Sequence, residues 1–192
     1  MKIGLFGGSF DPPHNGHLTI ATSFLKELQL DEVLFIPAYI APQKGHRTYA
    51  TAADRLNMLR LALAGHPHFR INTVEIEREG ISYTIDTIRF LKAQEPQAEY
   101  YLLIGADSLL DFANWREPEA ILNSVQVVIA KRPECDLDKV EPKFLQQVIV
   151  LKNQMSPISS SLVRNRVRQG QSLEGYVPQA IAQYITEHKL YR

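Results

Sequence analysis

The segment from Gly7 to His17 reads GGSFDPPHNGH and joins a short apolar run, Lys2–Phe6, to an amphipathic stretch, Gly16–Leu28. An apolar run that passes through glycines into a helix is typical of the first half of a βαβ unit. Glycine lets the backbone approach a ligand closely, and the start of a helix offers unpaired N–H groups to an anion. The segment therefore predicts a parallel α/β fold with a phosphate-binding loop after its first strand.

The same alternation continues along the chain. Short runs rich in Val, Ile, Leu, Phe and Tyr predict strands, and apolar residues at helical spacing predict the helices between them. The expected strands are Lys2–Phe6, Glu32–Ile36, Arg70–Val74, Tyr100–Ile104, Val125–Ala130 and Val148–Leu151. The expected helices are Gly16–Leu28, Ala52–Ala64, Thr84–Ala93, Glu117–Asn123, Ser159–Gln169 and Pro178–His188. Irregular chain is expected at Pro37–Ala50, Glu75–Ser82, Lys131–Lys143 and Lys152–Pro157.

Strands and helices in alternation imply right-handed crossovers onto one parallel sheet. We therefore predict a Rossmann-like, doubly wound α/β sheet in a single domain over residues 1–192, closed by C-terminal helices. Thr51 is expected to cap the helix that contains Asp54 in its first turn. Ligands of open parallel sheets bind beyond the carboxyl ends of the strands. The loops after the first, second, fourth and fifth strands are therefore expected to carry the chemistry.

Composition limits the classes of function. The 192 residues contain 21 Lys and Arg against 21 Asp and Glu, and this zero net charge argues against a dedicated nucleic-acid binder. The single cysteine, Cys135, excludes an internal disulfide and suits a reducing compartment. No apolar run reaches the roughly 18 residues of a membrane span, and the N-terminus does not resemble a signal peptide. We expect a cytoplasmic protein that binds no membrane, and its assembly into a homo-oligomer stays open.

His14 and His17 lie three residues apart at the expected start of a helix. This spacing places both imidazoles on one side, where they can donate hydrogen bonds to phosphate oxygens. The alternatives are a simple glycine turn and a zinc site, although no further Cys or His cluster lies nearby. The segment has neither the dinucleotide fingerprint nor the lysine of a Walker A motif, so those two modes of cofactor binding are excluded.

A second group of polar residues, Ile158-Ser159-Ser160-Ser161-Leu162-Val163-Arg164, stands near the other end of the chain. Hydroxyls at a helix start both cap the helix and offer donors to phosphate. Arg164, one turn later, supplies a permanently charged fork for phosphate oxygens. The alternative is a capped helix with a solvated arginine.

Together the two segments resemble the HxGH and ISSTxxR motifs of a nucleotidyltransferase superfamily, with Ser161 in place of the threonine. Two central segments, Ser82–Thr87 (SYTIDT) and Gly105-Ala106-Asp107 followed by Phe112 and Trp115, resemble the SYTxDT and GxD…F…W motifs of its bacterial nicotinate-nucleotide adenylyltransferases. The resemblance covers essentially the whole chain. It implies adenylyl transfer from ATP to nicotinate mononucleotide, giving nicotinate adenine dinucleotide and pyrophosphate in NAD biosynthesis.

The resemblance also implies the site residues. Catalytic roles fall to His14, His17, Lys44 and Arg164. ATP-binding roles fall to Gly7, Gly8, His14, His17, Gly105, Asp107, Arg132, Ile158, Ser160, Ser161 and Arg164. Roles in binding nicotinate mononucleotide fall to Ser9, Phe10, Lys44, Tyr83, Thr84 and Trp115. Mg²⁺ is expected to arrive with ATP, held by ATP oxygens and water, because no carboxylate cage is visible.

Physical reasons accompany several of these roles. Trp115 offers a flat surface for a pyridine ring, unless it only fills the core. Backbone N–H groups at Tyr83-Thr84 suit a carboxylate and disfavour an amide. Asp107 can accept from ribose hydroxyls or cap a helix from Ser108 onward.

The family pattern PxxxPPHK near Lys44 is incomplete, because Ala41 and Gln43 replace a proline and the histidine. These two departures put the stiffness of the loop in doubt but keep its charge. Two rival functions remain open. One is a phosphopantetheine adenylyltransferase, and the other is a non-catalytic nucleotide-binding module on the same fold.

Overall fold

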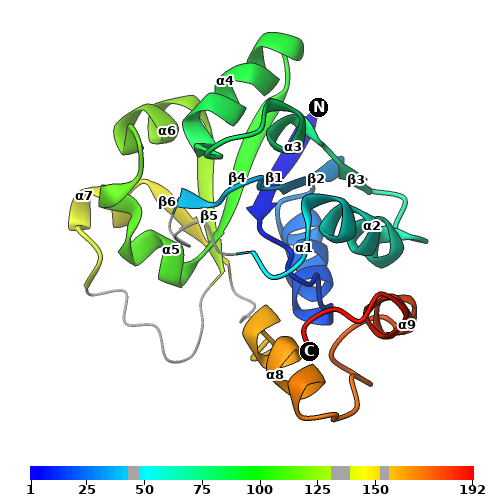
Figure 1. The fold of residues 1–192 in the computed structure, drawn as a ribbon. Coiled ribbons are helices and arrows are strands. Elements are labelled where there is room, and N and C mark those ends of the chain that lie inside the picture. The colour runs from blue at the N-terminus through cyan, green and yellow to red at the C-terminus, as the bar shows by residue number, and fades with distance from the viewer. Residues whose placement is uncertain (43–47, 131–138, 152–155) are drawn as a thin grey trace.

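The computed structural model describes residues 1–42, 48–130, 139–151 and 156–192. Their centre is a parallel sheet in the order β3-β2-β1-β4-β5-β6 (Figure 1). The strands are β1 (Lys2–Gly8), β2 (Glu32–Pro37), β3 (Phe69–Ile71), β4 (Glu99–Gly105), β5 (Gln126–Ala130) and β6 (Val148–Val150). In this doubly wound order the direction of winding reverses between β1 and β4, which is where such sheets bind ligands. The predicted Rossmann-like parallel sheet is confirmed.

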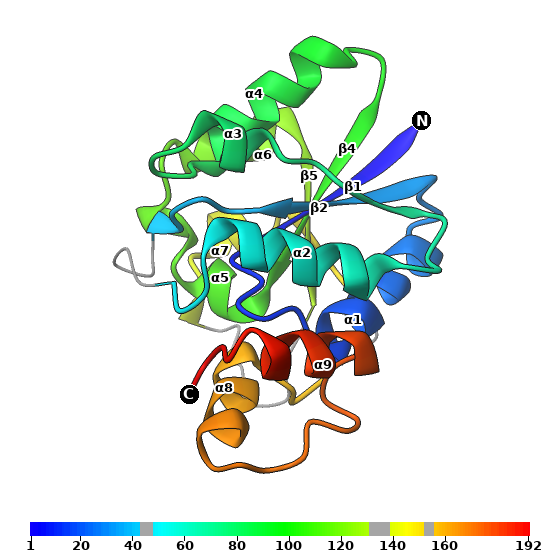
Figure 2. The same ribbon diagram turned by 45° about the vertical axis from the view of Figure 1, so that its right-hand side comes forward.

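Helices cover both faces of the sheet (Figures 1 and 2). The longer helices are α1 (Asn15–Glu27), α2 (Ala52–Leu63), α4 (Thr84–Gln94), α6 (Pro118–Ser124), α8 (Ser160–Arg168) and α9 (Gln179–Glu187). The shorter ones are α3 (Val74–Arg78), α5 (Ala106–Leu110), the 3₁₀ turn η2 (Phe112–Asn114) and α7 (Pro142–Leu145). The core on one face contains residues of α1, α2, α8 and α9, and the core on the other contains residues of α3 to α7.

Strand β5 shows why the central strands are apolar at consecutive positions. Val127 and Ile129 belong to one core cluster, whereas Val128 and Ala130 belong to the other. Successive side chains of a strand point to opposite faces, and here both faces are covered. Such a strand therefore needs apolar residues throughout, as the sequence predicted.

One region differs from the prediction. The chain after β3 was expected to be strand up to Val74 and irregular from Glu75 to Ser82, but Val74–Arg78 forms α3. Asn72 Oδ1 accepts the backbone N–H of Val74 at 3.0 Å and so satisfies a donor at the start of this helix. The elements α5, η2 and α7 were also not predicted. Helices of three to five residues are too short to show an apolar period.

The predicted cap of α2 is confirmed. Thr51 caps α2, and its side chain accepts the backbone N–H of Asp54 at 3.1 Å. Across the described ranges no helix is both long enough and apolar enough to span a bilayer.

Candidate active site

The loop between β1 and α1 is held in place by Asp11, a residue that the sequence analysis did not select. Its buried carboxylate accepts the backbone N–H groups of Tyr49 at 2.7 Å and Ala50 at 3.1 Å, and the hydroxyl of Tyr191 at 2.8 Å. Burial, followed by the charge of Asp11, raises the pKa of Tyr191, so this hydroxyl keeps its proton. Asp11 therefore ties the first loop to the chain before α2 and to the C-terminus. No local pattern could reveal a partner at the end of the chain.

His14 and His17 lie together at the start of α1. Their rings stack with centroids 3.6 Å apart. The His17 Nδ1 accepts the backbone N–H of His14 at 3.1 Å, so the proton of a neutral His17 ring is on Nε2. A Cβ added at Gly16 would lie 3.0 Å from His14 Nδ1 and 3.3 Å from the carbonyl oxygen of Ile158. Glycine at this position therefore lets α1, the His14 ring and the chain before α8 approach one another.

The start of α8 is attached to the first loop. The Ser160 hydroxyl donates to the carbonyl of Pro12 at 2.8 Å, and the Arg164 guanidinium donates to the carbonyl of Asp11 at 2.7 Å and to the Ser161 hydroxyl at 3.0 Å. The predicted helix cap is confirmed, because the Ser159 side chain accepts the N–H of Leu162. The two predicted phosphate-binding segments therefore meet, although they stand at opposite ends of the chain.

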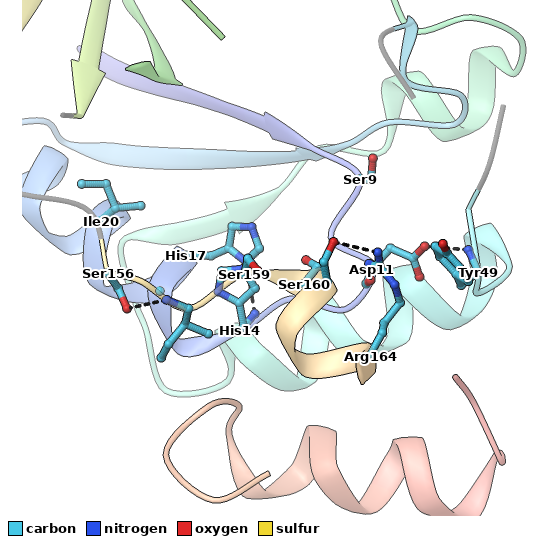
Figure 3. A pocket seen from close by; sticks show the side chains of 13 residues that line it. Ser9, Asp11, His14, His17, Ile20, Tyr49, Ser156, Ser159, Ser160 and Arg164 are labelled. Carbon is cyan, nitrogen blue, oxygen red and sulfur yellow. Dashed lines mark hydrogen bonds between the residues drawn. The ribbon is translucent and has the colours of Figure 1, made fainter. Parts of the chain in front are cut away.

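These two segments line a first cavity of about 510 Å³ (Figure 3). Two of the lining residues contact each other, because the Arg164 guanidinium lies over the Tyr49 ring, 4.2 Å from its centroid. Its lining residues are Ser9, Asp11, His14, Gly16, His17, Ile20, Tyr49, Ser156, Ile158, Ser159, Ser160, Ser161 and Arg164. Imidazole, hydroxyl and guanidinium donors dominate this list, which suits an anion rich in oxygen.

A second cavity, of about 340 Å³, lies beyond the ends of β1 and β4. Predicted site residues that line it are Gly7, Gly8, Ser9, His17, Thr84, Gly105, Asp107 and Trp115. A smaller pocket of about 210 Å³ shares Thr84 and Trp115 with it and adds Tyr83. Only Ser9 and His17 line both the first and the second cavity among the described residues, so these two side chains mark the junction.

Comparison with known proteins adds the family to this geometry. Residues 5–166 match the family model described as cytidylyltransferase-like. A Geobacillus kaustophilus protein named "Probable nicotinate-nucleotide adenylyltransferase" is 45% identical over 190 residues, which cover 99% of this chain and 86% of that protein. A Bacillus licheniformis protein of the same name is 40% identical over 190 residues, covering 99% and 98% of the two chains. This chain belongs to the nicotinate-nucleotide adenylyltransferases.

The predicted family and enzyme class are therefore confirmed, and the chain is a nucleotidyltransferase. Its fold is similar to that of Plasmodium falciparum nicotinic acid mononucleotide adenylyltransferase complexed with NaAD. The TM-score is 0.82 at 20% identity, over 99% of this chain and 97% of that one. The same Plasmodium protein complexed with APC gives a TM-score of 0.81 at 18% identity, over 99% and 96%. At these identities the likeness concerns the fold.

Some predicted site residues of this adenylyltransferase lie elsewhere. Lys44 and Arg132 fall outside the described residues. The Phe10 side chain is buried in the core and packs edge-on against His17, with centroids 5.0 Å apart, so it lines neither cavity.

Two predictions about helix starts change, one for the cap of α5 and one for the free N–H groups of α4. Gly105, not Asp107, occupies the N-cap position of α5, so the alternative that Asp107 caps a helix from Ser108 onward is wrong. The Tyr83 N–H donates to the Ile81 carbonyl at 3.2 Å, and the Asp86 N–H donates to the Tyr83 carbonyl at 3.1 Å. Thr84 and Ile85 therefore supply the remaining first-turn donors of α4.

A divalent cation has few protein ligands in this site. The Asp11 carboxylate is already engaged by three donors. In the part of the chain that the structure describes, no three His, Cys, Asp or Glu side chains are grouped to hold a metal ion. The described residues therefore suit a divalent cation whose ligands come mainly from substrate phosphates and water.

Proposed function

We propose that the two cavities hold the two substrates of one adenylyl transfer. Membership of the family gives the overall reaction, in which ATP and nicotinate mononucleotide yield nicotinate adenine dinucleotide and pyrophosphate in NAD biosynthesis. ATP lies with its phosphates in the first cavity, and nicotinate mononucleotide lies in the second. The observation that carries this assignment is the junction at Ser9 and His17, which line both cavities.

Ser9 supports the junction in a further way. Its hydroxyl oxygen is buried and has no hydrogen-bond partner within the described residues. A buried hydroxyl without a partner costs free energy, so a ligand that accepts from it gains affinity. We assign its ligand as the phosphate of nicotinate mononucleotide, which must approach the α-phosphate of ATP here.

The reaction needs no protein nucleophile. An oxygen of the acceptor phosphate attacks the α-phosphorus of ATP, the bond from that phosphorus to its bridging oxygen breaks, and pyrophosphate leaves with the electron pair. The acceptor phosphate is already an anion near neutral pH, so no general base is required. Catalysis therefore consists of holding two anions in line and stabilising the charge on the transferring group.

The donors of the first cavity provide this stabilisation. His17 presents Nε2–H, because its Nδ1 is held by the backbone N–H of His14. Arg164 contributes a fixed positive charge, oriented by its bonds to Asp11 and Ser161. We assign to Lys44 a contact with the phosphates of ATP and with the phosphate of nicotinate mononucleotide. Mg²⁺ arriving with ATP would neutralise part of the phosphate charge, and no side chain of the described chain is assigned as its ligand.

The second cavity selects the acceptor. The Trp115 ring offers a stacking surface for the pyridine. The N–H groups of Thr84 and Ile85 in the first turn of α4 suit the acid group of nicotinate, whereas an amide would turn an NH₂ donor toward them. Asp107 and Gly105 also line the second cavity, and we assign them to the ribose of ATP, which therefore extends from the first cavity into the second.

Measuring pyrophosphate release tests the proposal. The protein is incubated with ATP, Mg²⁺ and one of three acceptors: nicotinate mononucleotide, nicotinamide mononucleotide or phosphopantetheine. We expect rapid release with the first and slower release with the second. Rapid release with phosphopantetheine alone would establish the rival transferase, and binding of ATP without release from any acceptor would establish a non-catalytic module.

A further inference from the structure

Glu75 is a buried carboxyl group that the mechanism above does not use. Only 6% of this residue is exposed, and it lines the second cavity together with Ser82 and Thr87. Its Oε1 accepts the Thr87 hydroxyl at 2.6 Å. A carboxyl group is tolerated in such a place only when it is hydrogen-bonded, and Thr87 supplies a short bond here.

The Thr87 hydroxyl makes a second bond. Its Oγ1 accepts from the Arg78 guanidinium at 3.1 Å. A hydroxyl that accepts in this way still has its own proton to donate, and the carboxyl group of Glu75 accepts that proton. Glu75 therefore holds Thr87, near the start of α4, against α3.

Thr87 belongs to one of two walls of the second cavity. One wall is the segment 38–42 after β2, and the other begins α4 at Thr84. Ile40 and Ile81 form an isolated parallel bridge, and the N–H of Ser82 donates to the Ile40 carbonyl at 2.9 Å. The Tyr39 N–H donates to Ser82 Oγ at 3.0 Å, but pairing over so few residues is weak by itself. The bond from Thr87 to Glu75 gives the start of α4 a second attachment, on α3.

We propose that Glu75 is a positioning residue for acceptor selection. It fixes the start of α4 against α3 through Thr87, so that the N–H groups of Thr84 and Ile85 hold one place relative to Trp115. The acid group of the acceptor is then met by donors at a defined position. This inference rests on the proposed function, because it assumes that the second cavity takes nicotinate mononucleotide.

Steady-state kinetics of Glu75→Gln test it. Glutamine keeps the size of the side chain but replaces the two carboxyl oxygens by one amide oxygen and one NH₂ group, which weakens its bond with the Thr87 hydroxyl. Loss of one such bond corresponds to about a tenfold effect, so we expect KM for nicotinate mononucleotide to rise about tenfold while KM for ATP stays within about twofold. The preference for nicotinate over nicotinamide mononucleotide, as a ratio of kcat/KM, falls by a similar factor.

Two further substitutions separate positioning from general support of the fold. Thr87→Val removes the hydroxyl at nearly constant volume and reproduces the Glu75→Gln effect, whereas Thr87→Ser keeps the hydroxyl and stays close to the wild type. Glu77→Gln is the matched control, because Glu77 lies in the same helix but is exposed and bonds to Thr73. It leaves both KM values unchanged. An equal rise in both KM values for Glu75→Gln, or a lower melting temperature with neither KM changed, overturns the proposal.

A binding measurement distinguishes this inference from the proposed function. Trp115 is the single tryptophan of the chain and lines the second cavity, so its fluorescence reports acceptor binding without turnover. The wild type could bind nicotinate mononucleotide but release no pyrophosphate. That result would contradict the proposed function alone. The Kd values of the variants for this acceptor would then still decide the role of Glu75. A wild-type protein that neither binds nor turns over this acceptor overturns both.

Discussion

The Arg164 guanidinium donates a hydrogen bond of 2.7 Å to the backbone carbonyl of Asp11, across 153 residues of sequence. This bond places a permanent positive charge from α8 beside the first loop, where His14 and His17 begin α1. The Asp11 side chain meanwhile holds the Tyr191 hydroxyl near the C-terminus. Asp11 therefore connects the first loop to the Arg164 guanidinium through its carbonyl and to the C-terminal Tyr191 through its side chain.

Removing the imidazole of His17 tests its role in stabilising the transferring phosphate. One donor to a developing charge contributes about 2.7–4 kcal/mol to the barrier, so His17→Ala lowers kcat about a hundredfold or more. The fold stays intact, because the ring lies at the junction of two cavities rather than deep in a core. Pyrophosphate release gives kcat, and circular dichroism during heating checks the fold. A fully active variant would refute the role.

Arg164→Lys tests whether the shape of the guanidinium matters in addition to its charge. Lysine keeps the charge but cannot donate to the Asp11 carbonyl and the Ser161 hydroxyl from one planar group. We expect kcat/KM for ATP to fall about tenfold, and Arg164→Ala to fall further. Equal activity of the lysine variant and the wild type would show that only the charge is needed.

Gly16→Ala tests the close approach behind the histidine pair. The added methyl group would lie 3.0 Å from His14 Nδ1 and 3.3 Å from the Ile158 carbonyl, so the ring or the chain before α8 must move. A displacement of about 1 Å costs about a hundredfold in rate, and these contacts require the neighbours to move by a few tenths of an ångström. We therefore expect kcat to fall by up to about tenfold, with little change in melting temperature. Retention of wild-type kcat would show that His14 and the Ile158 carbonyl can move aside without any effect on catalysis.

Asp11→Asn tests the connection between the first loop and the chain ends. The substitution replaces a charged acceptor of three hydrogen bonds, and bonds to a charged group contribute about 1.5–3 kcal/mol. We expect the free energy of unfolding in urea to fall by about that amount. Tyr191→Phe is the matched control, since it removes one of the three donors and costs about 1 kcal/mol. A loss in Tyr191→Phe as large as that in Asp11→Asn would contradict this division.

The stability contributed by Glu75 depends on pH in a defined direction. Burial raises the pKa of this carboxyl above its ordinary value of 4.5, and its bonds to Thr87 and Ser82 oppose the rise only in part. Its contribution is therefore most favourable below pH 4.5 and is lost as the pH rises through the folded pKa. The free energy of unfolding of the wild type minus that of Glu75→Gln accordingly decreases from pH 4 to pH 8. Urea unfolding across this range measures it, and a difference that grows with pH would contradict the sign.

Much of the site could be predicted because its residues are local to strand ends and helix starts. His14 and His17 occupy the first turn of α1, and Ser159 caps α8, as their spacing indicated. The chain from Val74 to Arg78 was wrongly expected to be strand and loop, because an isolated turn of helix has no period to detect. The predicted roles of Lys44 and Arg132 stay predictions.

The sequence by itself determined the parallel sheet and the two phosphate-binding segments, since consecutive apolar positions, helical periods and capping residues act over a few neighbouring residues. Only the tertiary structure decided which distant groups pair. The pairs of Asp11 with Tyr191, Arg164 with Asp11, and Glu75 with Thr87 depend on how crossovers bring separate strand ends and helix starts together. Such pairs have no fixed spacing along the chain, because a hydrogen bond depends on the positions of two atoms in space and not on the number of residues between them.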